Sequence, residues 1–171
     1  MNYLTELLAS HHDRKAFSCG NKMLDDYFHY QAGQDIKRKL AVCFVCTDQE
    51  SGLVLGYYTL ANNSIPQYWI PEDFKKKLPR SYENIPATLM GRLAVDTRFQ
   101  GKGNGRMLLI DAFKRSYEVS KQAGSFAIVV DPVDEDAFRF YKKYGFLILP
   151  DSGKMFLPMK TVKILFDSTE S

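Results

Sequence analysis

The sequence predicts an α/β protein, of the α+β kind, with a single mixed central sheet of about six to seven strands flanked by helices. Two observations point to this fold class. Two apolar segments, residues 40–47 and 53–61, are separated by a short polar turn, which predicts an antiparallel hairpin. Farther along, apolar runs at residues 88–95 and 125–130 are linked by a glycine-rich turn and a helical pattern, and such a crossover predicts two parallel neighbouring strands.

The segment before the hairpin is predicted to hold a short strand over residues 2–8 and a helix over residues 25–39. The helix is indicated by side chains that recur at helical spacing on one face, namely Leu24, Tyr27, Phe28, Gln31 and Ala32. Between the hairpin and the first parallel strand lies a proline-punctuated insertion, residues 65–86, with at most one short helix near residues 72–78.

The chain after the second parallel strand is predicted to contain one more helix and two more strands. The helix begins near Asp134, with acidic residues in its first turn, lysines in its last turn and Gly145 after its end. Strands are predicted near Phe146 and over residues 154–165. A length of 171 residues with 45% hydrophobic content suffices for one sizeable core, so residues 1–171 are predicted to form a single domain.

Composition and charge exclude several classes of protein. The net charge of +3 does not by itself indicate nucleic-acid binding, and no run approaches the roughly 20 apolar residues of a membrane helix. The start of the chain does not resemble a signal peptide, and three cysteines, an odd number, argue against a disulfide framework. We therefore expect a protein of a reducing compartment, the cytoplasm.

Neither the cysteines nor the histidines show the spacing of a metal site. Cys43 and Cys46 form a C-x-x-C pair, but within a strand their side chains face opposite ways, so we interpret both as packing residues. His11, His12 and His29 have no partner at ligand spacing. The sequence therefore predicts no metal.

The glycine-rich turn is a candidate phosphate site, because it exposes backbone N–H groups at the start of a helix. It does not fit the dinucleotide fingerprint, since Arg106 or Leu108 stands where a third glycine is needed. It does not fit a Walker A loop either, because Gly105 is not followed by Lys-Ser/Thr. What remains reads Q-x-x-G-x-G from Gln100 to Gly105, a pattern that a purely structural turn would also satisfy.

This loop resembles the pyrophosphate loop of the GNAT N-acetyltransferases, and the segment A-x-x-F-Y-x-x-x-G-F from Ala137 to Phe146 resembles their second signature. The resemblance implies the GNAT fold, acetyl-CoA as co-substrate, and two parallel strands that splay apart to hold it. It also implies a set of cofactor-binding positions. Backbone groups of the first parallel strand would pair with the pantetheine arm and the loop would cradle the pyrophosphate: Leu93, Ala94, Val95, Gln100, Gly101, Lys102, Gly103, Asn104, Gly105 and Arg106. Apolar residues in that strand equally fit an ordinary buried strand, and the two cations equally fit a solvated helix start.

The resemblance assigns a catalytic role to Tyr141, which occupies the family's Phe-Tyr position. A phenol with an ordinary pKa near ~10 stays protonated at neutral pH and can donate to the departing thiolate as general acid. Tyr144 is its rival, and the Val95 amide is the candidate oxyanion donor. No general base stands out among Asp25, Asp26, Glu83 and water. Asp134 departs from the Asn that several family members carry, so we leave it out of the site.

Three segments of the sequence, residues 17–28, 56–60 and 91–96, are similar to the acetyltransferases that act as toxins in bacterial toxin–antitoxin pairs. This resemblance implies acetylation of the α-amine of aminoacyl-tRNA, a ribbon-helix-helix antitoxin, and a homodimer as an open possibility. Two alternatives remain: an acetyltransferase for a small-molecule, protein or peptide amine, and a non-catalytic acetyl-CoA sensor. Basic clusters that could face tRNA, or be solvated surface, are Lys37-Arg38-Lys39, Lys75-Lys76-Lys77 and Lys142-Lys143.

Overall fold

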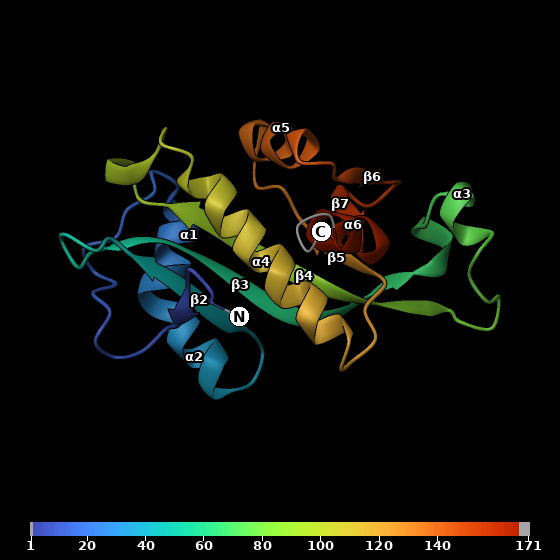
Figure 1. Ribbon diagram of the computed structural model, residues 1–171, viewed down its shortest axis with the longest axis horizontal. Coiled ribbons are helices and arrows are strands. Elements are labelled where there is room, and N and C mark those ends of the chain that lie inside the picture. The colour runs from blue at the N-terminus through green and yellow to red at the C-terminus, as the bar shows by residue number, and fades with distance from the viewer. Residues whose placement is uncertain (1, 168–171) are drawn as a thin grey trace. The chain divides into compact units, whose positions relative to one another are not determined.

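The computed structural model describes residues 2–167. Within these residues the strands form a seven-stranded sheet in the order β1-β2-β3-β4-β5-β7-β6 (Figure 1). The β4–β5 pair is parallel, with Thr88 opposite Ile128, whereas β1–β2, β2–β3, β5–β7 and β6–β7 are antiparallel. The predicted mixed sheet, its hairpin and its parallel crossover are therefore confirmed.

The chain divides into two compact units, which are described in turn. The first comprises Met1–Ala61 and Met90–Phe113, and the second comprises Asn62–Leu89 and Lys114–Ser171. Strands β3 (Val54–Pro66) and β4 (Asn84–Val95) and helix α4 (Asn104–Ser120) contribute residues to both units.

In the first unit, one face of the sheet is covered by a helical segment. It consists of α1 (Lys22–Asp26), the π-helical turn η1 (Tyr27–Gln31) and α2 (Ala32–Lys37), and it begins where the Asn21 side chain accepts a hydrogen bond from the Leu24 N–H. Its apolar side chains pack on alternate residues of β2 (Val42–Thr47), Cys43 and Val45, and on Val54 and Tyr57 of β3. The buried residues of this core are Phe17, Leu24, Tyr27, Phe28, Ala32, Cys43, Val45, Val54, Tyr57 and Ala94.

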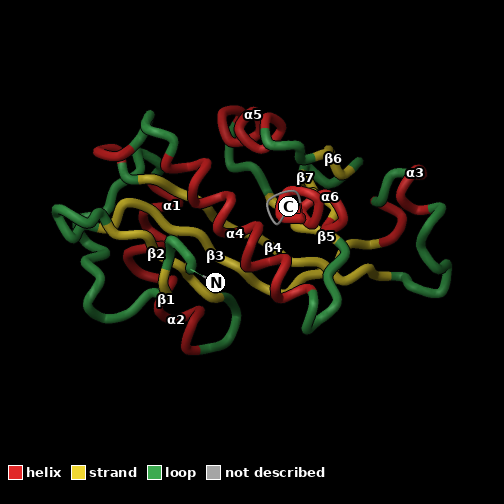
Figure 2. The backbone as a smooth tube through the Cα atoms, viewed as in Figure 1, coloured by secondary structure: helices red, strands yellow, loops and turns green. Residues whose placement is uncertain are grey.

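The opposite face of the same strands carries the first half of α4. Asp111 of α4 is buried, and its carboxylate accepts hydrogen bonds from the Tyr58 hydroxyl (2.6 Å) and the Thr5 hydroxyl (2.5 Å). It also accepts from the Leu4 N–H (2.7 Å), which fastens the segment before β1 (Glu6–Leu7) to the helix. Figure 2 shows β1 beside β2, with which it pairs. Because Tyr57 and Tyr58 are neighbours in a strand, their side chains point to opposite faces, one to each helical layer.

The second unit is built on β5 (Ala127–Val130), β7 (Lys154–Pro158) and β6 (Leu147–Leu149). The insertion after β3 contains the 3-10 turn η2 (Gln67–Trp69) and the short helix α3 (Glu72–Lys75), and Phe74 packs edge-to-face on Phe156 at 5.4 Å. In the same unit, helix α6 (Met159–Asp167) lies beside the end of α4, where the rings of Phe166 and Tyr117 stack 6.3 Å apart.

The prediction for the end of the chain is wrong in part. Residues 154–165 were expected to form one strand, but the strand ends at Pro158 and a helix follows. The β-branched Thr161, Val162 and Ile164 favoured a strand, yet Met159 and Val162 are buried at a spacing of three, which fits one face of a helix. The predicted first strand is also shorter than expected, since only Glu6–Leu7 pairs with β2.

The remaining expectations about the elements agree with the structure in outline. Strands β3 and β4 are longer than predicted and extend into the insertion, which leaves α3 as its one short helix among the described residues. Cys43 and Cys46 face opposite sides of β2 as free thiols, and Cys43 lies in the core. Among the helices within residues 2–167, none is both long and apolar enough to cross a membrane.

Candidate active site

The turn that follows β4 is held by a buried carboxylate. Asp96 accepts hydrogen bonds from the Arg98 side chain (2.8 Å), from the Arg98 N–H (2.9 Å) and from the Ser18 N–H (3.0 Å). These donors stabilise the charged form, Arg98 most of all, and they lower the pKa of Asp96 to about 2. The turn η3 (Thr97–Phe99) is thereby tied to the segment before α1, since Thr97 also bonds to Ser18. The carboxylate therefore fixes where the glycine loop begins.

The glycine loop lies between this turn and the first turn of α4. Gly101 and Gly103 have φ of +74° and +81°, conformations that favour glycine, and a Cβ on either would meet nothing within 4 Å. The loop is therefore open on the side where side chains would stand. The Met107 N–H already bonds to the Gly103 carbonyl (3.1 Å), and the N–H groups that precede it at the helix start have no intrahelical carbonyl to bind. This arrangement fits the predicted phosphate site.

The predicted loop residues divide into supporting and exposed ones. The Gln100 side-chain amide donates to the carbonyls of Val95 (2.8 Å) and Cys19 (2.9 Å), so its N–H groups hold the loop in place. The Asn104 amide likewise donates to Phe99 (2.8 Å). Lys102 and Arg106 are exposed, and neither is ion-paired within the described part of the chain. Only these two cations are available to a ligand through their side chains.

The strand that leads into the loop lies unusually close to β3. A Cβ on Gly56 of β3 would stand 2.7 Å from the Ala94 carbonyl oxygen and 2.6 Å from Leu108 Cδ1. Only glycine allows this approach, which brings β3, β4 and α4 together behind the loop. Ala94 is buried and Leu93 and Val95 are partly exposed, as expected for a strand with some backbone left to pair.

The predicted catalytic residue, Tyr141, lies in the second unit on helix α5 (Glu135–Lys143). Its ring packs edge-to-face against Phe140 (5.4 Å) and Phe146 (5.2 Å), and burial raises the pKa of its phenol above the ordinary value. No hydrogen-bond partner of its hydroxyl is found within residues 2–167. Tyr144, its rival, caps the end of the same helix and packs against Phe140.

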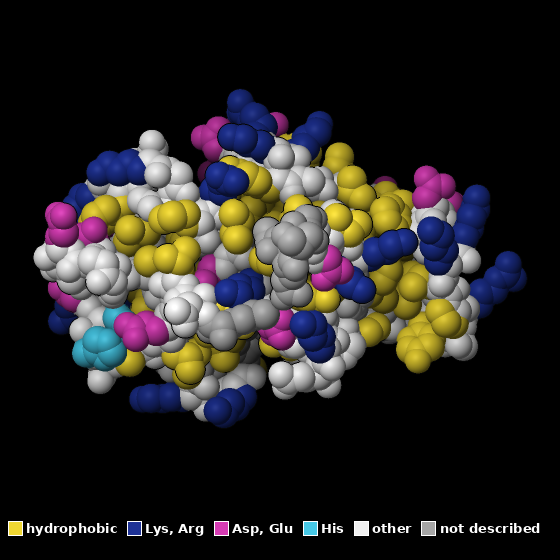
Figure 3. Space-filling view, in the orientation of Figure 1, with side chains coloured by type: hydrophobic (Ala, Val, Ile, Leu, Met, Phe, Trp, Pro, Cys, Tyr) yellow, Lys and Arg dark blue, Asp and Glu magenta, His cyan; other side chains and the backbone are white. Residues whose placement is uncertain are grey.

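Asp134 acts as the N-cap of α5, because its carboxylate accepts from the Ala137 N–H (2.8 Å). This capping role accounts for an aspartate at position 134, and no bound ligand is needed to explain it. Figure 3 shows basic and acidic side chains side by side over α5, which holds Lys142 and Lys143 in its last turn. Because positively and negatively charged side chains lie side by side over α5, this helix carries no dominant basic patch in that view.

Comparison with known proteins decides the family. A family model described as "Acetyltransferase (GNAT) domain" matches residues 39–147. The chain belongs to the GNAT acetyltransferase family. It is 35% identical to a "tRNA-acetylating toxin" of Mycobacterium tuberculosis, over 90% of each chain. It is also 32% identical to a "Probable toxin TacT" of Sinorhizobium fredii, over 90% of this chain and 89% of that one.

Solved structures of GNAT toxins share the fold over almost the whole chain. A mutant of KacT matches with a TM-score of 0.88 and 27% identity, covering 97% of this chain and 100% of that one. AtaT complexed with acetyl-methionyl-tRNAfMet matches with a TM-score of 0.86 and 29% identity, covering 96% and 99%. AtaTR bound with AcCoA matches with a TM-score of 0.82 and 29% identity, covering 95% and 96%.

One group that the sequence did not predict lies in the first unit of this GNAT chain, against α1, η1 and α2. Arg92 of β4 places its guanidinium over the Tyr27 ring, 3.6 Å from the centroid, and both residues line an open pocket. A cation inside an otherwise apolar strand run was the signal that could have revealed it. The Tyr27 hydroxyl in turn donates to the buried Asp35 (3.1 Å).

Two of the proposed bases have local partners. Asp25 accepts from the Cys19 N–H (2.8 Å) and the Ser18 hydroxyl (3.1 Å), and Asp26 pairs with Lys22. Glu83 is exposed in the insertion. None of the three stands out as a base.

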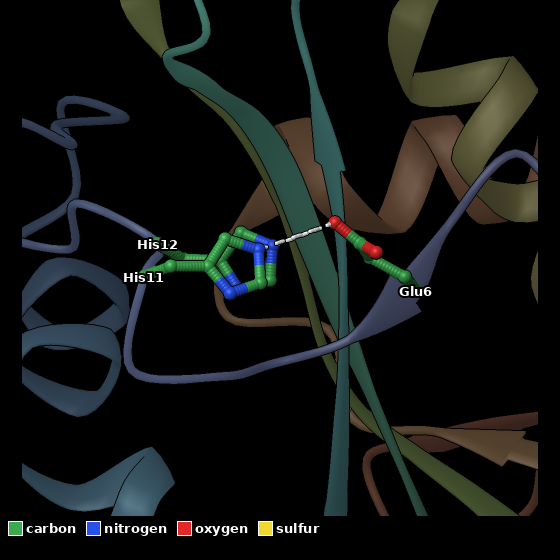
Figure 4. A group of neighbouring side chains, drawn as sticks. All are labelled: Glu6, His11 and His12. Atoms are coloured by element: carbon green, nitrogen blue, oxygen red, sulfur yellow. Dashed lines mark hydrogen bonds and ion pairs between the residues drawn. The ribbon is translucent and has the colours of Figure 1, made fainter.

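Contrary to what the spacing suggested, His11 and His12 do come together with a carboxylate, whereas His29 lies at the Phe17 carbonyl oxygen. Figure 4 shows the imidazoles of His11 and His12 beside Glu6, whose Oε1 lies 2.9 Å from His12 Nε2 and 3.7 Å from His11 Nε2. A group of this composition can bind a metal ion. However, His12 Nδ1 accepts the Ala9 N–H (2.9 Å), so the neutral ring carries its proton on Nε2 and donates it to Glu6. His12 therefore offers no free lone pair, and we interpret the group as a hydrogen-bonded cluster.

Proposed function

We propose that this chain is an acetyl-CoA-dependent N-acetyltransferase that acetylates the α-amine of aminoacyl-tRNA and acts as the toxin of a toxin–antitoxin pair. The observation that carries the proposal is the similarity to a tRNA-acetylating toxin over 90% of both chains. A structure of AtaT with acetyl-methionyl-tRNAfMet, which shares this fold at a TM-score of 0.86, supports it independently.

We assign the residues the binding roles that the GNAT resemblance implies. The open loop from Gln100 to Arg106, at the start of α4, would hold the pyrophosphate, with Lys102 and Arg106 adding charge-assisted bonds. The backbone of Leu93, Ala94 and Val95 would pair with the pantetheine arm. Acetyl-CoA itself supplies an acetyl group activated as a thioester. We propose that residues 1–171 act as a single domain in this reaction, since β3, β4 and α4 each run through both units.

Tyr141 is proposed to assist the departing sulfur. Attack by the amine releases one proton, and the thiolate that leaves takes up one. The reaction is therefore balanced in protons overall, and the chain only has to assist the transfer of one proton from the amine to the sulfur. Burial raises the pKa of the Tyr141 phenol, so the hydroxyl stays protonated and can donate a hydrogen bond as negative charge grows on sulfur. The Val95 N–H is proposed to stabilise the charge on the carbonyl oxygen.

The proposed partners follow from the relatives. AtaT has been solved bound to the C-terminus of its antitoxin AtaR, and KacTA with DNA. We propose that an antitoxin, of the ribbon-helix-helix type, neutralises this chain, and that the chain forms a homodimer. Because charged tRNA is the proposed substrate, we also propose that the chain acts in the cytoplasm.

Radiolabelled acetyl-CoA tests the proposal. The purified chain is supplied with charged tRNA, with the same tRNA after deacylation, and with a panel of free polyamines, peptides and lysine. Label on charged tRNA alone is expected. Label on small amines alone would leave the GNAT reaction in place and transfer the activity to the alternative acceptor class, and binding of acetyl-CoA without any transfer would indicate a sensor.

A further inference from the structure

The side chain of Gln100 holds more than the glycine loop that it precedes. Its Nε2 donates to the Val95 carbonyl oxygen (2.8 Å), at the end of β4, and to the Cys19 carbonyl oxygen (2.9 Å), 81 residues away in the chain. A side-chain amide nitrogen carries two hydrogens, so these two bonds engage both of them. Because both acceptors are carbonyl oxygens, the nitrogen of the amide must face them and its oxygen must face away.

The Cys19 end of this bridge is anchored. The Ser18 N–H donates to the buried carboxylate of Asp96 (3.0 Å), and the N–H of the residue after Asp96 donates to the Ser18 carbonyl (2.9 Å). The segment beside Cys19 is therefore fastened to the turn that follows β4. One hydrogen of the Gln100 amide is held by this fixed acceptor, which directs the other hydrogen at Val95.

The backbone groups of Val95 point to the open edge of β4. The N–H and C=O of one strand residue face the same edge, and successive residues face opposite edges. The Asp96 N–H donates to the Leu55 carbonyl of β3 (2.9 Å), so the groups of Val95 face away from β3. On that side, β5 pairs with β4 only at Thr88 and Leu89 within residues 2–167. Val95 therefore lies at a part of the edge with which β5 does not pair.

The carbonyl oxygen of Val95 lies on the same edge as the Val95 N–H, which is the proposed oxyanion donor. Its partial negative charge would repel the negative charge that develops on the thioester oxygen, most strongly where water is excluded. The hydrogen bond from Gln100 places positive partial charge against that carbonyl and fixes its direction. Val95 then presents a donor to the thioester oxygen while its own acceptor is already engaged.

Asn104 provides a comparison, because it is the second side-chain amide that supports the loop. Its Nδ2 donates to the Phe99 carbonyl (2.8 Å), in the turn before the loop, and no hydrogen bond from this amide to β4 is found within residues 2–167. Both amides hold the loop, but only that of Gln100 also reaches the strand. The two roles can therefore be separated by experiment.

We propose that Gln100 is a positioning residue for the transfer step: it engages the Val95 carbonyl and so leaves the Val95 N–H to stabilise negative charge on the thioester oxygen. The inference rests on the proposed function, in which this N–H has that role. Gln100 acts through Val95 and does not touch the reacting atoms. Its removal should therefore slow the transfer more than it weakens the binding of acetyl-CoA.

Gln100→Met tests this role, because methionine has nearly the same length but no donor, and Gln100 is exposed, so the core is not disturbed. With charged tRNA as acceptor, we expect kcat to fall about tenfold or more while the Kd for acetyl-CoA stays within about twofold. Asn104→Leu is the matched control: it removes the other amide and should instead raise the Kd for acetyl-CoA. Unchanged kcat in Gln100→Met, or a loss that appears only as a raised Kd, would overturn the inference.

An infrared measurement needs no acceptor and is therefore independent of the proposed substrate. The stretching frequency of the thioester carbonyl is recorded for bound acetyl-CoA that is isotope-labelled at that carbon, because a stronger hydrogen bond to the oxygen lowers this frequency. It should be lower in wild type than in Gln100→Met, and Gln100→Lys, which restores a donor of similar reach, should lower it again. The same frequency in all three complexes would overturn the inference.

Failure of the inference and failure of the proposed function give different results. If wild type and Gln100→Met differ in the carbonyl frequency but charged tRNA stays unlabelled, the proposed substrate is refuted and the role of Gln100 is kept. If charged tRNA is labelled but the frequency is the same in every complex, the role of Gln100 is refuted and the proposed function is kept.

Discussion

Tyr141 is the residue on which the proposed chemistry depends most, through its phenol. It is 7% exposed and packs between two aromatic rings, so burial alone raises the pKa of its hydroxyl. A phenol in such surroundings loses its proton only above pH ~10, and it remains a hydrogen-bond donor throughout the neutral range. The same rings would hold its position in the absence of catalysis, so geometry and activity have to be separated by experiment.

Replacement of Tyr141 with Phe keeps the ring and its packing but removes the donor. We expect kcat to fall about a hundredfold or more, with the Kd for acetyl-CoA nearly unchanged, because donation to the leaving sulfur contributes in the transition state. Tyr144→Phe is the matched control and should retain activity. Steady-state kinetics and equilibrium binding check both. Unchanged turnover in Tyr141→Phe, or an equal loss in Tyr144→Phe, would exclude the assignment.

Asp96 makes a prediction about stability and pH. Its pKa of about 2 in the folded chain lies below the ordinary 3.8, chiefly because of the Arg98 side chain. The carboxylate therefore stabilises the fold above pH ~4, by about 2 kcal/mol, and this contribution is lost as the pH falls through about 2. Asp96→Asn should lower the free energy of unfolding by about that amount at pH 7 and by less at pH 3, as urea titrations can measure. A difference that stays the same from pH 7 to pH 3 would contradict this account.

At the scale of elements, the site depends on how closely β3, β4 and α4 approach. The contact at Gly56 is tight because an added Cβ would collide both with a side chain, Leu108, and with a backbone oxygen of Ala94. Leu108 could change rotamer, but the strand cannot shift without moving the start of the glycine loop. Close packing behind the loop therefore determines the position of the loop itself.

Gly56→Ala is expected to destabilise the fold by about 3 kcal/mol and to weaken acetyl-CoA binding, because β4 would have to move. Gly124→Ala is the control: a Cβ there meets nothing within 4 Å, so the change should stay within about 0.5 kcal/mol. Thermal melts and equilibrium binding measure the two effects. A Gly56→Ala variant as stable as wild type would show that the approach is not the constraint we describe.

Elements with a strong local signal could be predicted from the sequence, and those decided by tertiary packing could not. The hairpin, the crossover and the α5 helix were all indicated by turns, periodicity and charge. The end of the chain was predicted wrongly, because β-branched residues favoured a strand while burial of Met159 and Val162 favoured a helix. The extra length of β3 and β4 was hidden by prolines at the strand ends.

At the scale of the whole molecule, the motifs that identify the family are contiguous in the sequence, whereas the pocket that Arg92 lines is formed by residues far apart in it. The Q-x-x-G-x-G loop and the A-x-x-F-Y segment are each contiguous in sequence, so the family could be inferred from them and is confirmed. Arg92 and Tyr30 are about sixty residues apart in the chain, and only the fold brings them to one pocket. Glu6, His11 and His12 are by contrast close in the sequence, but their spacing did not reveal that the turn at residues 9–12 brings their side chains together. The roles of the loop residues and of Tyr141 stay predictions.

The central claim is that the chain acetylates the α-amine of an aminoacyl-tRNA. The most direct measurement is acetyl transfer to one charged tRNA, compared with the same tRNA after its α-amine has been blocked with a formyl group. Both substrates share every phosphate and base, so only the reacting nitrogen differs. We predict transfer to the free amine, none to the blocked one, and an acetylated amino acid released from the product by mild base. Equal labelling of the two substrates, or acetyl retained on the RNA after base treatment, would contradict the account.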